Sequence, residues 1–126
     1  MHLIDSDIRI WLTRGDQSAR KRLAQIAPWR ISVITYLEIA QGCRNRQELE
    51  RAKRGLRRRQ TEIVLLTPAI SQRAMDLIDA HSLSSGLLLA DALIAATAIE
   101  NRLTLLTGNA RHFAAIVELK TEIFER

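Results

Sequence analysis

The feature that most constrains the fold is an almost wholly apolar run from Leu87 to Ile99, interrupted only by Asp91 and Thr97. A helix that is apolar on all sides has no surface suited to water, so this run predicts a buried central helix. It is too short to cross a membrane, which takes about 20 residues. A buried carboxylate is costly unless it is paired, hydrogen-bonded or bound to a metal. Asp91 is therefore a helix cap, a partner of a buried arginine, or part of a functional site.

Short apolar strands alternate with helices along the rest of the chain. The predicted strands cover residues 3–4, 31–34, 63–66, 103–106 and, weakly, 122–124. The predicted helices cover residues 8–12, 18–27, 35–42, 47–59, 70 to about 84, 87–99 and 113–117. This alternation predicts an α/β fold with a parallel sheet that helices cover on both faces. A length of 126 residues fits one domain spanning 1–126.

Positive charge is concentrated in one segment. Residues 44–59 contain eight basic and two acidic side chains, and the rest of the chain is nearly neutral. A localised basic patch suits a polyanion, most often a nucleic acid, although a solvated helix face is the alternative. The candidate RNA-binding residues are Arg51, Lys53, Arg54, Arg57, Arg58 and Arg59. The lone cysteine, Cys43, allows no intramolecular disulfide, and the N-terminus lacks a signal-peptide pattern, so we expect a cytoplasmic protein.

Acidic and polar side chains follow several of the predicted strands. Asp5 ends the first strand, Glu38 lies in the first turn of the helix after the second, and Thr107 and Asn109 follow the fourth. Asp91 lies early in the helix that leads into the fourth strand. Ligands of open parallel sheets bind beyond the carboxyl ends of the strands, so these side chains are expected to meet at one edge.

Each of these residues also has a purely structural interpretation. Glu38 follows Thr35 by three positions, which matches a helix capping box. Asp7 fits the N-cap of the helix predicted at 8–12 better than a metal ligand, and Asn109 is a natural N-cap for the last helix. Asp5 has the weakest structural interpretation, because an acid directly after a buried strand rarely serves packing.

The combined set points to metal chemistry. Three carboxylates without a cysteine, and with His112 as the only nearby imidazole, describe a site for Mg²⁺ or Mn²⁺ rather than zinc or copper. Such an ion activates water and neutralises charge on a phosphoryl group. Together with the basic segment, Asp5, Glu38 and Asp91 therefore predict the hydrolysis of phosphodiester bonds.

Four segments resemble the motifs of a known family in order and at compatible spacing. They are Leu-Ile-Asp-Ser-Asp at the start, Ile-Ser-Val-Ile-Thr-Tyr-Leu-Glu, Ala-Asp-Ala-Leu-Ile-Ala-Ala-Thr-Ala, and Leu-Leu-Thr-Gly-Asn-Ala-Arg-His-Phe. These segments resemble the motifs of PIN-domain nucleases, and the size and wording are most similar to the VapC toxins of bacterial toxin–antitoxin pairs.

The resemblance implies a five-stranded parallel sheet and a Mg²⁺- or Mn²⁺-dependent endoribonuclease that acts on tRNA or rRNA. It also implies a homodimer and a neutralising antitoxin. The metal ligands and catalytic residues carried over by motif are Asp5, Glu38 and Asp91, with Asp7 a further candidate. Thr107 matches a hydroxyl position that would support the ligands. The chain departs from the family pattern in having no acid between Thr107 and Val117. Asn109 would offer a neutral oxygen there instead, to the metal or to its ligands, which puts a second metal in doubt.

Two other classes of protein remain as alternatives. A receiver-type signalling domain also gathers acids at the head of a parallel sheet, but it needs an aspartate after the third strand, where this chain has Thr67 and Pro68. A PIN-fold interaction protein with weak or no catalysis is the second alternative.

Overall fold

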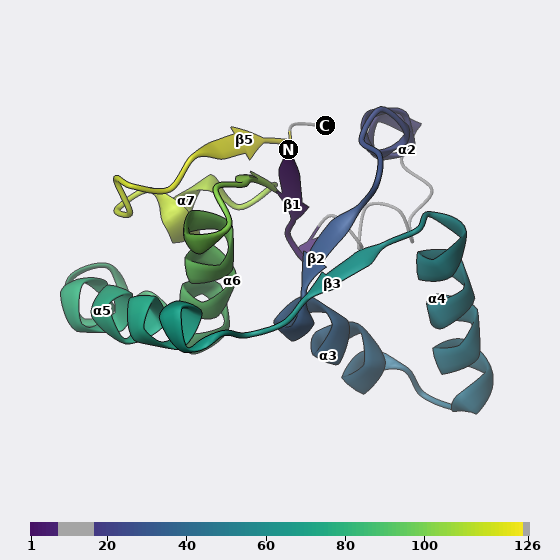
Figure 1. The fold of residues 1–126 in the computed structure, drawn as a ribbon, viewed down its shortest axis with the longest axis horizontal. Coiled ribbons are helices and arrows are strands. Elements are labelled where there is room, and N and C mark those ends of the chain that lie inside the picture. The colour runs from purple at the N-terminus through teal and green to yellow at the C-terminus, as the bar shows by residue number, and fades with distance from the viewer. Residues whose placement is uncertain (8–16, 125–126) are drawn as a thin grey trace.

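The computed structural model describes residues 1–7 and 17–124 (Figure 1). Its strands are β1 (His2–Ile4), β2 (Arg30–Ser32), β3 (Glu62–Val64), β4 (Thr104–Thr107) and β5 (Thr121–Ile123). Its helices are α2 (Gln17–Ala24), α3 (Val33–Gly42), α4 (Arg46–Arg58), α5 (Pro68–Ser85), α6 (Leu89–Glu100) and α7 (Ala110–Phe113). The helix predicted at residues 8–12 lies outside the described residues.

All strand pairs of the described residues are parallel, as predicted. β4 lies between β1 and β5 in a three-stranded ladder, and β2 pairs with β3 in a second ladder. β1 and β2 are in contact, although no ladder joins them. The predicted α/β fold and its five parallel strands are therefore confirmed, with the hydrogen bonding divided into two ladders between β1 and β2.

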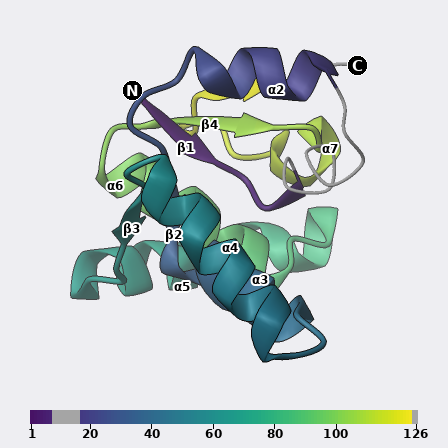
Figure 2. The same cartoon turned by 90° about the vertical axis from the view of Figure 1, so that its right-hand side faces the viewer.

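Helices cover both faces of the three-stranded ladder, as Figure 2 shows with α2 on one side of β1 and β4 and with α5 and α6 on the other. On the first side, Ile4 and Leu106 pack with residues of α2. On the second side, Leu3 and Leu105 pack with α5 and α6. This arrangement follows from the alternation of side chains along a strand, because neighbouring residues point to opposite faces.

The central helix is buried over most of its length. Residues 94–98 of α6 are all buried, which confirms the expectation from the apolar run. Its alanines permit close packing against α5, and an ion pair of 2.8 Å between Arg73 and Glu100 joins the two helices. The start of the run differs from the prediction, because Leu88 and Leu89 are 65% and 71% exposed.

Capping side chains set several helix boundaries. The Ser32 hydroxyl accepts a hydrogen bond of 3.0 Å from the amide of Ile34, so β2 ends at Ser32 rather than at Ile34. Thr67 caps α5, whose first residue is Pro68. The last predicted helix is the four-residue α7, and it begins earlier in the chain than predicted. Of the helices in the described ranges, none is both long and apolar enough to span a membrane.

Candidate active site

Asp5 lies directly after β1 and is 4% exposed. Its backbone amide donates to the carbonyl of Leu106 at 2.9 Å, which fixes the chain at the carboxyl end of the ladder. The Thr107 hydroxyl donates to Oδ2 of Asp5 at 2.7 Å, and the Ser6 amide donates to Oδ1 at 2.8 Å. Burial raises the pKa of the Asp5 carboxyl, and these hydrogen bonds offset only part of that effect. A charged Asp5 is therefore held in position at an energetic cost.

Asp7 and Asn109 join the end of β1 to the turn after β4. Oδ2 of Asp7 accepts a hydrogen bond of 2.8 Å from the amide of Gly108. The helix that Asp7 was expected to cap lies outside the described residues. Asn109 occupies the N-cap position of α7, but its side chain makes no capping hydrogen bond there. Its backbone amide instead donates to the Thr107 hydroxyl at 3.0 Å. Thr107 is thus the residue that supports Asp5, and Asn109 supports Thr107 through its backbone.

Glu38 has no capping role. Ser32 is the N-cap of α3, and Thr35 lies inside the helix with a buried hydroxyl, so the capping box of Thr35 and Glu38 is wrong. Oε1 of Glu38 is buried and has no hydrogen-bond partner among the described residues. A buried acceptor without a partner is rare in folded proteins and calls for an explanation. The structural interpretation of this glutamate is thereby removed.

Asp91 faces His112 across the gap between α6 and α7. Oδ2 of Asp91 lies 3.3 Å from Nδ1 of His112, and the Asp91 side chain is 20% exposed. Leu88 holds the N-cap position of α6 and no side chain caps it, so Asp91 is not the cap. No arginine pairs with Asp91 among the described ion pairs either. The cap interpretation of Asp91 is therefore wrong, and no arginine of residues 1–7 and 17–124 supports the ion-pair interpretation.

The three predicted acids share one electrostatic environment. Burial raises the pKa of Asp91, His112 partly opposes that rise, and the charges of Asp5 and Glu38 add to it. Within residues 1–7 and 17–124, no three His, Cys, Asp or Glu side chains are close enough to hold a metal ion together. A cation would therefore have to draw the carboxylates inward. The donor set fits a hard divalent cation, since it consists of carboxylate oxygens and includes the unpartnered Oε1 of Glu38.

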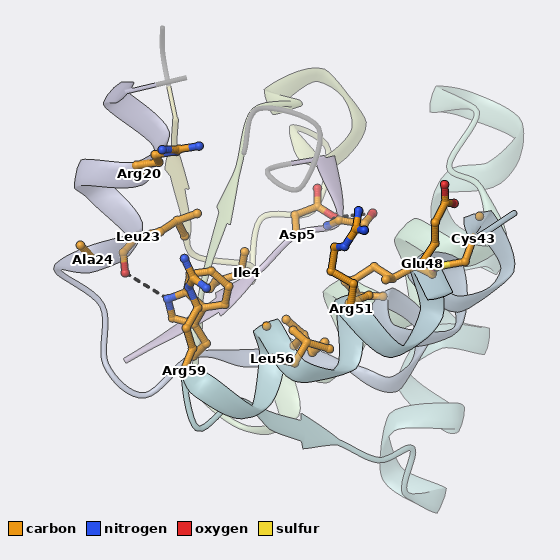
Figure 3. A pocket seen from close by; sticks show the side chains of 18 of the residues that line it. Ile4, Asp5, Arg20, Leu23, Ala24, Cys43, Glu48, Arg51, Leu56 and Arg59 are labelled. Carbon is orange, nitrogen blue, oxygen red and sulfur yellow. Dashed lines mark hydrogen bonds between the residues drawn. The ribbon is translucent and has the colours of Figure 1, made fainter. Parts of the chain in front are cut away.

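A groove of about 910 Å³ leads away from Asp5 between α2 and α4 (Figure 3). Ile4, Leu23 and Leu56 contribute apolar lining. Arg20 on α2 and Arg51 on α4 line opposite walls, with Asp5 between them in Figure 3. The groove therefore combines an apolar interior with positive charge on both walls and ends at a candidate catalytic acid.

Only part of the predicted basic set lines this groove. Arg51 and Arg59 do so, and Cζ of Arg59 lies 4.4 Å from the centre of the Trp29 ring. The remaining four members of the set, which do not line it, are Lys53, Arg54, Arg57 and Arg58. Arg58 instead lines a smaller neighbouring pocket that it shares with Arg20 and Arg59. The structure thus brings Arg51 and Arg59 of the predicted set to the groove and leaves the other four basic residues outside it.

Sequence reasoning missed two residues of this region. Arg20 belongs to a second basic helix, and the run of Arg20, Lys21 and Arg22 was the available signal. His112 was noted only as a nearby imidazole, yet its contact with Asp91 makes it part of the site. Both roles depend on how distant helices face one another, which local patterns do not reveal.

The family profile of the PIN domain matches residues 2–119 of the chain. No curated protein matches the chain. Among solved structures, the chain is similar to a toxin–antitoxin complex from Klebsiella pneumoniae, with 30% identity, a TM-score of 0.80, and coverage of 98% of this chain and 100% of the other.

Two further structures share the fold. VapBC2 from Rickettsia felis, bound to a DNA fragment from its promoter, has 22% identity and a TM-score of 0.80 and covers 98% of each chain. FitAcB from Neisseria gonorrhoeae has 21% identity and a TM-score of 0.77 and covers 96% of each chain. The profile match over nearly the whole chain and the 30% identity together settle the family: the chain belongs to the PIN-domain nucleases.

Proposed function

We propose that the chain is a Mg²⁺- or Mn²⁺-dependent endoribonuclease that acts as the toxin of a toxin–antitoxin pair. Asp5, Glu38 and Asp91 are its metal ligands, and residues 1–126 form one catalytic domain. The observation that carries this proposal is a set of buried acidic oxygens that the fold does not neutralise. Burial raises the pKa of Asp91, the nearby charges of Asp5 and Glu38 add to that rise, and Oε1 of Glu38 is buried without a hydrogen-bond partner among the described residues. Natural proteins keep such a cluster where a cation or a reaction needs it.

The mechanism assigns distinct tasks to the protein side chains. A bound divalent cation would activate water and neutralise charge on the phosphoryl oxygens. The Thr107 hydroxyl fixes Oδ2 of Asp5 at 2.7 Å, so that the carboxylate keeps its orientation as a ligand. Oε1 of Glu38 is buried and makes no hydrogen bond within the described part of the chain, so no existing bond there has to break before this oxygen binds a cation. The carboxylate oxygens of Asp5, Glu38 and Asp91 would thus hold the cation against the substrate phosphate.

The groove between α2 and α4 is the proposed path of the RNA. Arg20, Arg51 and Arg59 line it and can contact successive phosphates, while the apolar interior accommodates unstacked bases. The guanidinium of Arg59 stacks on the ring of Trp29, which orients it. The N–H groups along the edge of this guanidinium remain available to donate to phosphate oxygens. A strand that follows this path ends at Asp5. Single-stranded loops of tRNA or rRNA fit such a groove better than a duplex.

The antitoxin is the proposed protein partner. The similar structures are complexes of toxin and antitoxin, among them the one from Klebsiella pneumoniae. The groove could also bind a segment of that partner, because apolar side chains and acidic residues would complement its lining. Occupation by the partner would exclude RNA. Co-expression with the product of a small reading frame directly upstream tests this, and we expect a stable complex without nuclease activity.

A homodimer is proposed on the basis of exposed leucines. Leu37 on α3, Leu65 and Leu66 after β3, and Leu88 and Leu89 at α6 are 39–71% exposed. Because α3 contacts both β3 and α6, these leucines come from neighbouring elements. Apolar surface of this kind marks an interface more often than free surface. Light scattering should give a dimer mass, and Leu65→Asp should shift the protein towards the monomer.

Cleavage assays with purified protein test the proposed function. Structured tRNA, rRNA fragments, single-stranded DNA and duplex DNA are incubated with Mg²⁺, with Mn²⁺ or with chelator. We expect metal-dependent cuts in RNA at discrete positions and no cuts by Asp5→Asn. Asp79→Asn makes the same chemical change at an exposed position on α5 and should remain active. Metal binding without cleavage of any nucleic acid would favour the PIN-fold interaction protein instead.

A further inference from the structure

α7 presents His112 beside Asp91, at the candidate metal site. Phe113, the next residue, is 2% exposed and packs in the core, so this short helix is anchored. At the start of α7, the Asn109 amide donates a hydrogen bond to the Thr107 hydroxyl, which in turn donates to Asp5. The His112 side chain itself is 50% exposed. The helix that carries the imidazole is therefore anchored, and the ring itself remains accessible to a cation from solvent.

The geometry of His112 and Asp91 suits two ligands of one ion. Nδ1 of His112 and Oδ2 of Asp91 are 3.3 Å apart. Two adjacent ligands in an octahedral site with bonds of about 2.1 Å stand about 3 Å apart. A small movement would bring both atoms onto a shared cation. Burial raises the pKa of Asp5, and the charge of His112 is one of the smaller effects that oppose this rise, which indicates that the ring is near more than one of the acids.

The surrounding sequence offers no competing oxygen from a carboxylate. No acid occurs between Thr107 and Val117, and α7 places the imidazole of His112 beside Asp91. Mg²⁺ is bound in proteins almost entirely by oxygen ligands. Transition-metal ions accept imidazole readily, and their affinity for nitrogen sites rises from Mn²⁺ towards the later metals. An added nitrogen ligand would thus change which ion the site prefers.

We infer that His112 is a nitrogen ligand of the divalent metal and that it makes the site select Mn²⁺ over Mg²⁺. This inference rests on the proposed metal site formed by Asp5, Glu38 and Asp91. It assigns the metal preference to a side chain on α7. His112 completes the ligand set from the side of α7, where Asn109 provides only its backbone amide to Thr107.

Pulsed electron paramagnetic resonance on the Mn²⁺-loaded protein tests the inference directly, because it detects ¹⁴N nuclei bonded to the ion. We expect a nitrogen signal in the wild type and its loss in His112→Gln. His81→Gln is the matched control, since His81 lies on α5 and is not among the charged groups that act on Asp5 or Asp91, so its replacement should leave the signal intact. His2 contacts Glu122 and serves as a second control position.

Calorimetric titrations with Mn²⁺ and Mg²⁺ provide a second readout that does not depend on cleavage. The ratio of Mn²⁺ to Mg²⁺ affinity should fall by about tenfold or more in His112→Asp, the size expected when a group that tunes a metal site is replaced. A bound Mn²⁺ that is lost in Asp5→Asn but shows no nitrogen coupling in the wild type would overturn this inference alone. Failure of the wild type to bind either ion would overturn the proposed metal site as well.

Discussion

The pKa of Glu122 shifts in the opposite direction to the pKa values of Asp5 and Asp91. Glu122 on β5 accepts hydrogen bonds of 2.7 and 2.8 Å from Arg22, and His2 lies 2.9 Å from it. The hydrogen bonds from Arg22 are the main reason that the pKa of Glu122 falls to about 2. Burial instead raises the pKa of Asp5 and of Asp91. One acid has its counter-charge built into the fold, and the others do not.

The difference separates a structural role from a functional one. The network of His2, Arg22 and Glu122 joins β1, α2 and β5, so its charges hold elements together. Asp5 is supported by neutral donors, and Asp91 is met only by a half-exposed histidine among the described ion pairs. Neither arrangement neutralises the three acids. Their geometry is maintained by the fold at the expense of stability, which is typical of a site that receives its cation from outside.

The largest expected effect is that of Asp5→Asn. We expect metal affinity and RNA cleavage to fall by at least about 100-fold, because a direct ligand should matter more than the outer partners of a metal site. In chelator, the free energy of unfolding should stay equal or rise, since the change removes a costly buried charge. Calorimetry, cleavage assays and denaturant melts measure the three quantities. A metal affinity in Asp5→Asn equal to that of the wild type would show that Asp5 is structural and not a metal ligand.

The second prediction compares arginines that line the groove with basic residues nearby that do not. In the Asp5→Asn background, which should bind RNA without cutting it, Arg20→Gln and Arg51→Gln should each lower the slope of log affinity against log salt by about 0.7. Lys21→Gln and Arg54→Gln are the matched controls on the same helices and should change the slope much less. Fluorescence anisotropy over a salt series provides the slopes. Equal slopes for all four variants would place the RNA outside the groove.

Lowering the pH should affect the two groups of acids with opposite sign. The lowered pKa of Glu122 adds stability that is complete above its ordinary pKa of 4.5 and is lost as the pH falls through about 2. The raised pKa values of Asp5 and Asp91 cost stability at neutral pH, and this cost disappears as the pH falls to their ordinary value of 3.8. Denaturant melts in chelator should therefore show a smaller gain on acidification in Asp91→Asn than in the wild type. Identical pH profiles for the two proteins would contradict this assignment.

The smallest expected effect is that of Asn109→Asp. Its side chain makes no capping bond, so a new carboxylate should add charge to the proposed metal site without disturbing α7. We expect a rise of a few-fold in Mg²⁺ affinity, because ligand charge tunes such sites. Titration calorimetry on both forms measures it. The same affinity in the two proteins would show that residue 109 contributes to the site through its backbone alone.

The sequence predicted the parts of the site that depend on local context. Asp5 and Asp91 have apolar neighbours in the sequence, and a carboxylate serves no packing purpose there. The charged residue within an apolar segment identified both as candidates. The capping of α3 was mispredicted because Ser32 and Thr35 can both cap a helix, and only the backbone conformation decides between them. The position of β2 relative to β1 follows from long-range packing, so the division into two ladders could not be predicted from the strand pattern.

The contributions of His112 and Arg20 were beyond local patterns for a related reason. The orientation of His112 depends on a helix of four residues whose direction is set by the burial of Phe113. Arg20 lines the groove only because α2 faces α4 across it, and those helices are distant in sequence. Sequence patterns specify which residues share a face of one element, but not which elements face each other.

Thermal melts of Asp91→Asn and Glu122→Gln in chelator and with Mn²⁺ test the central claim most directly. In chelator, Glu122→Gln should lose about 1 kcal/mol of stability, as expected for a partly exposed ion pair, whereas Asp91→Asn should melt at or above the wild-type temperature. Mn²⁺ at 100 times its dissociation constant should stabilise the wild type and Glu122→Gln by about 2.7 kcal/mol and Asp91→Asn by much less. An Asp91→Asn protein that melts well below the wild type in chelator, yet gains the full stabilisation from Mn²⁺, would make Asp91 structural and contradict the account.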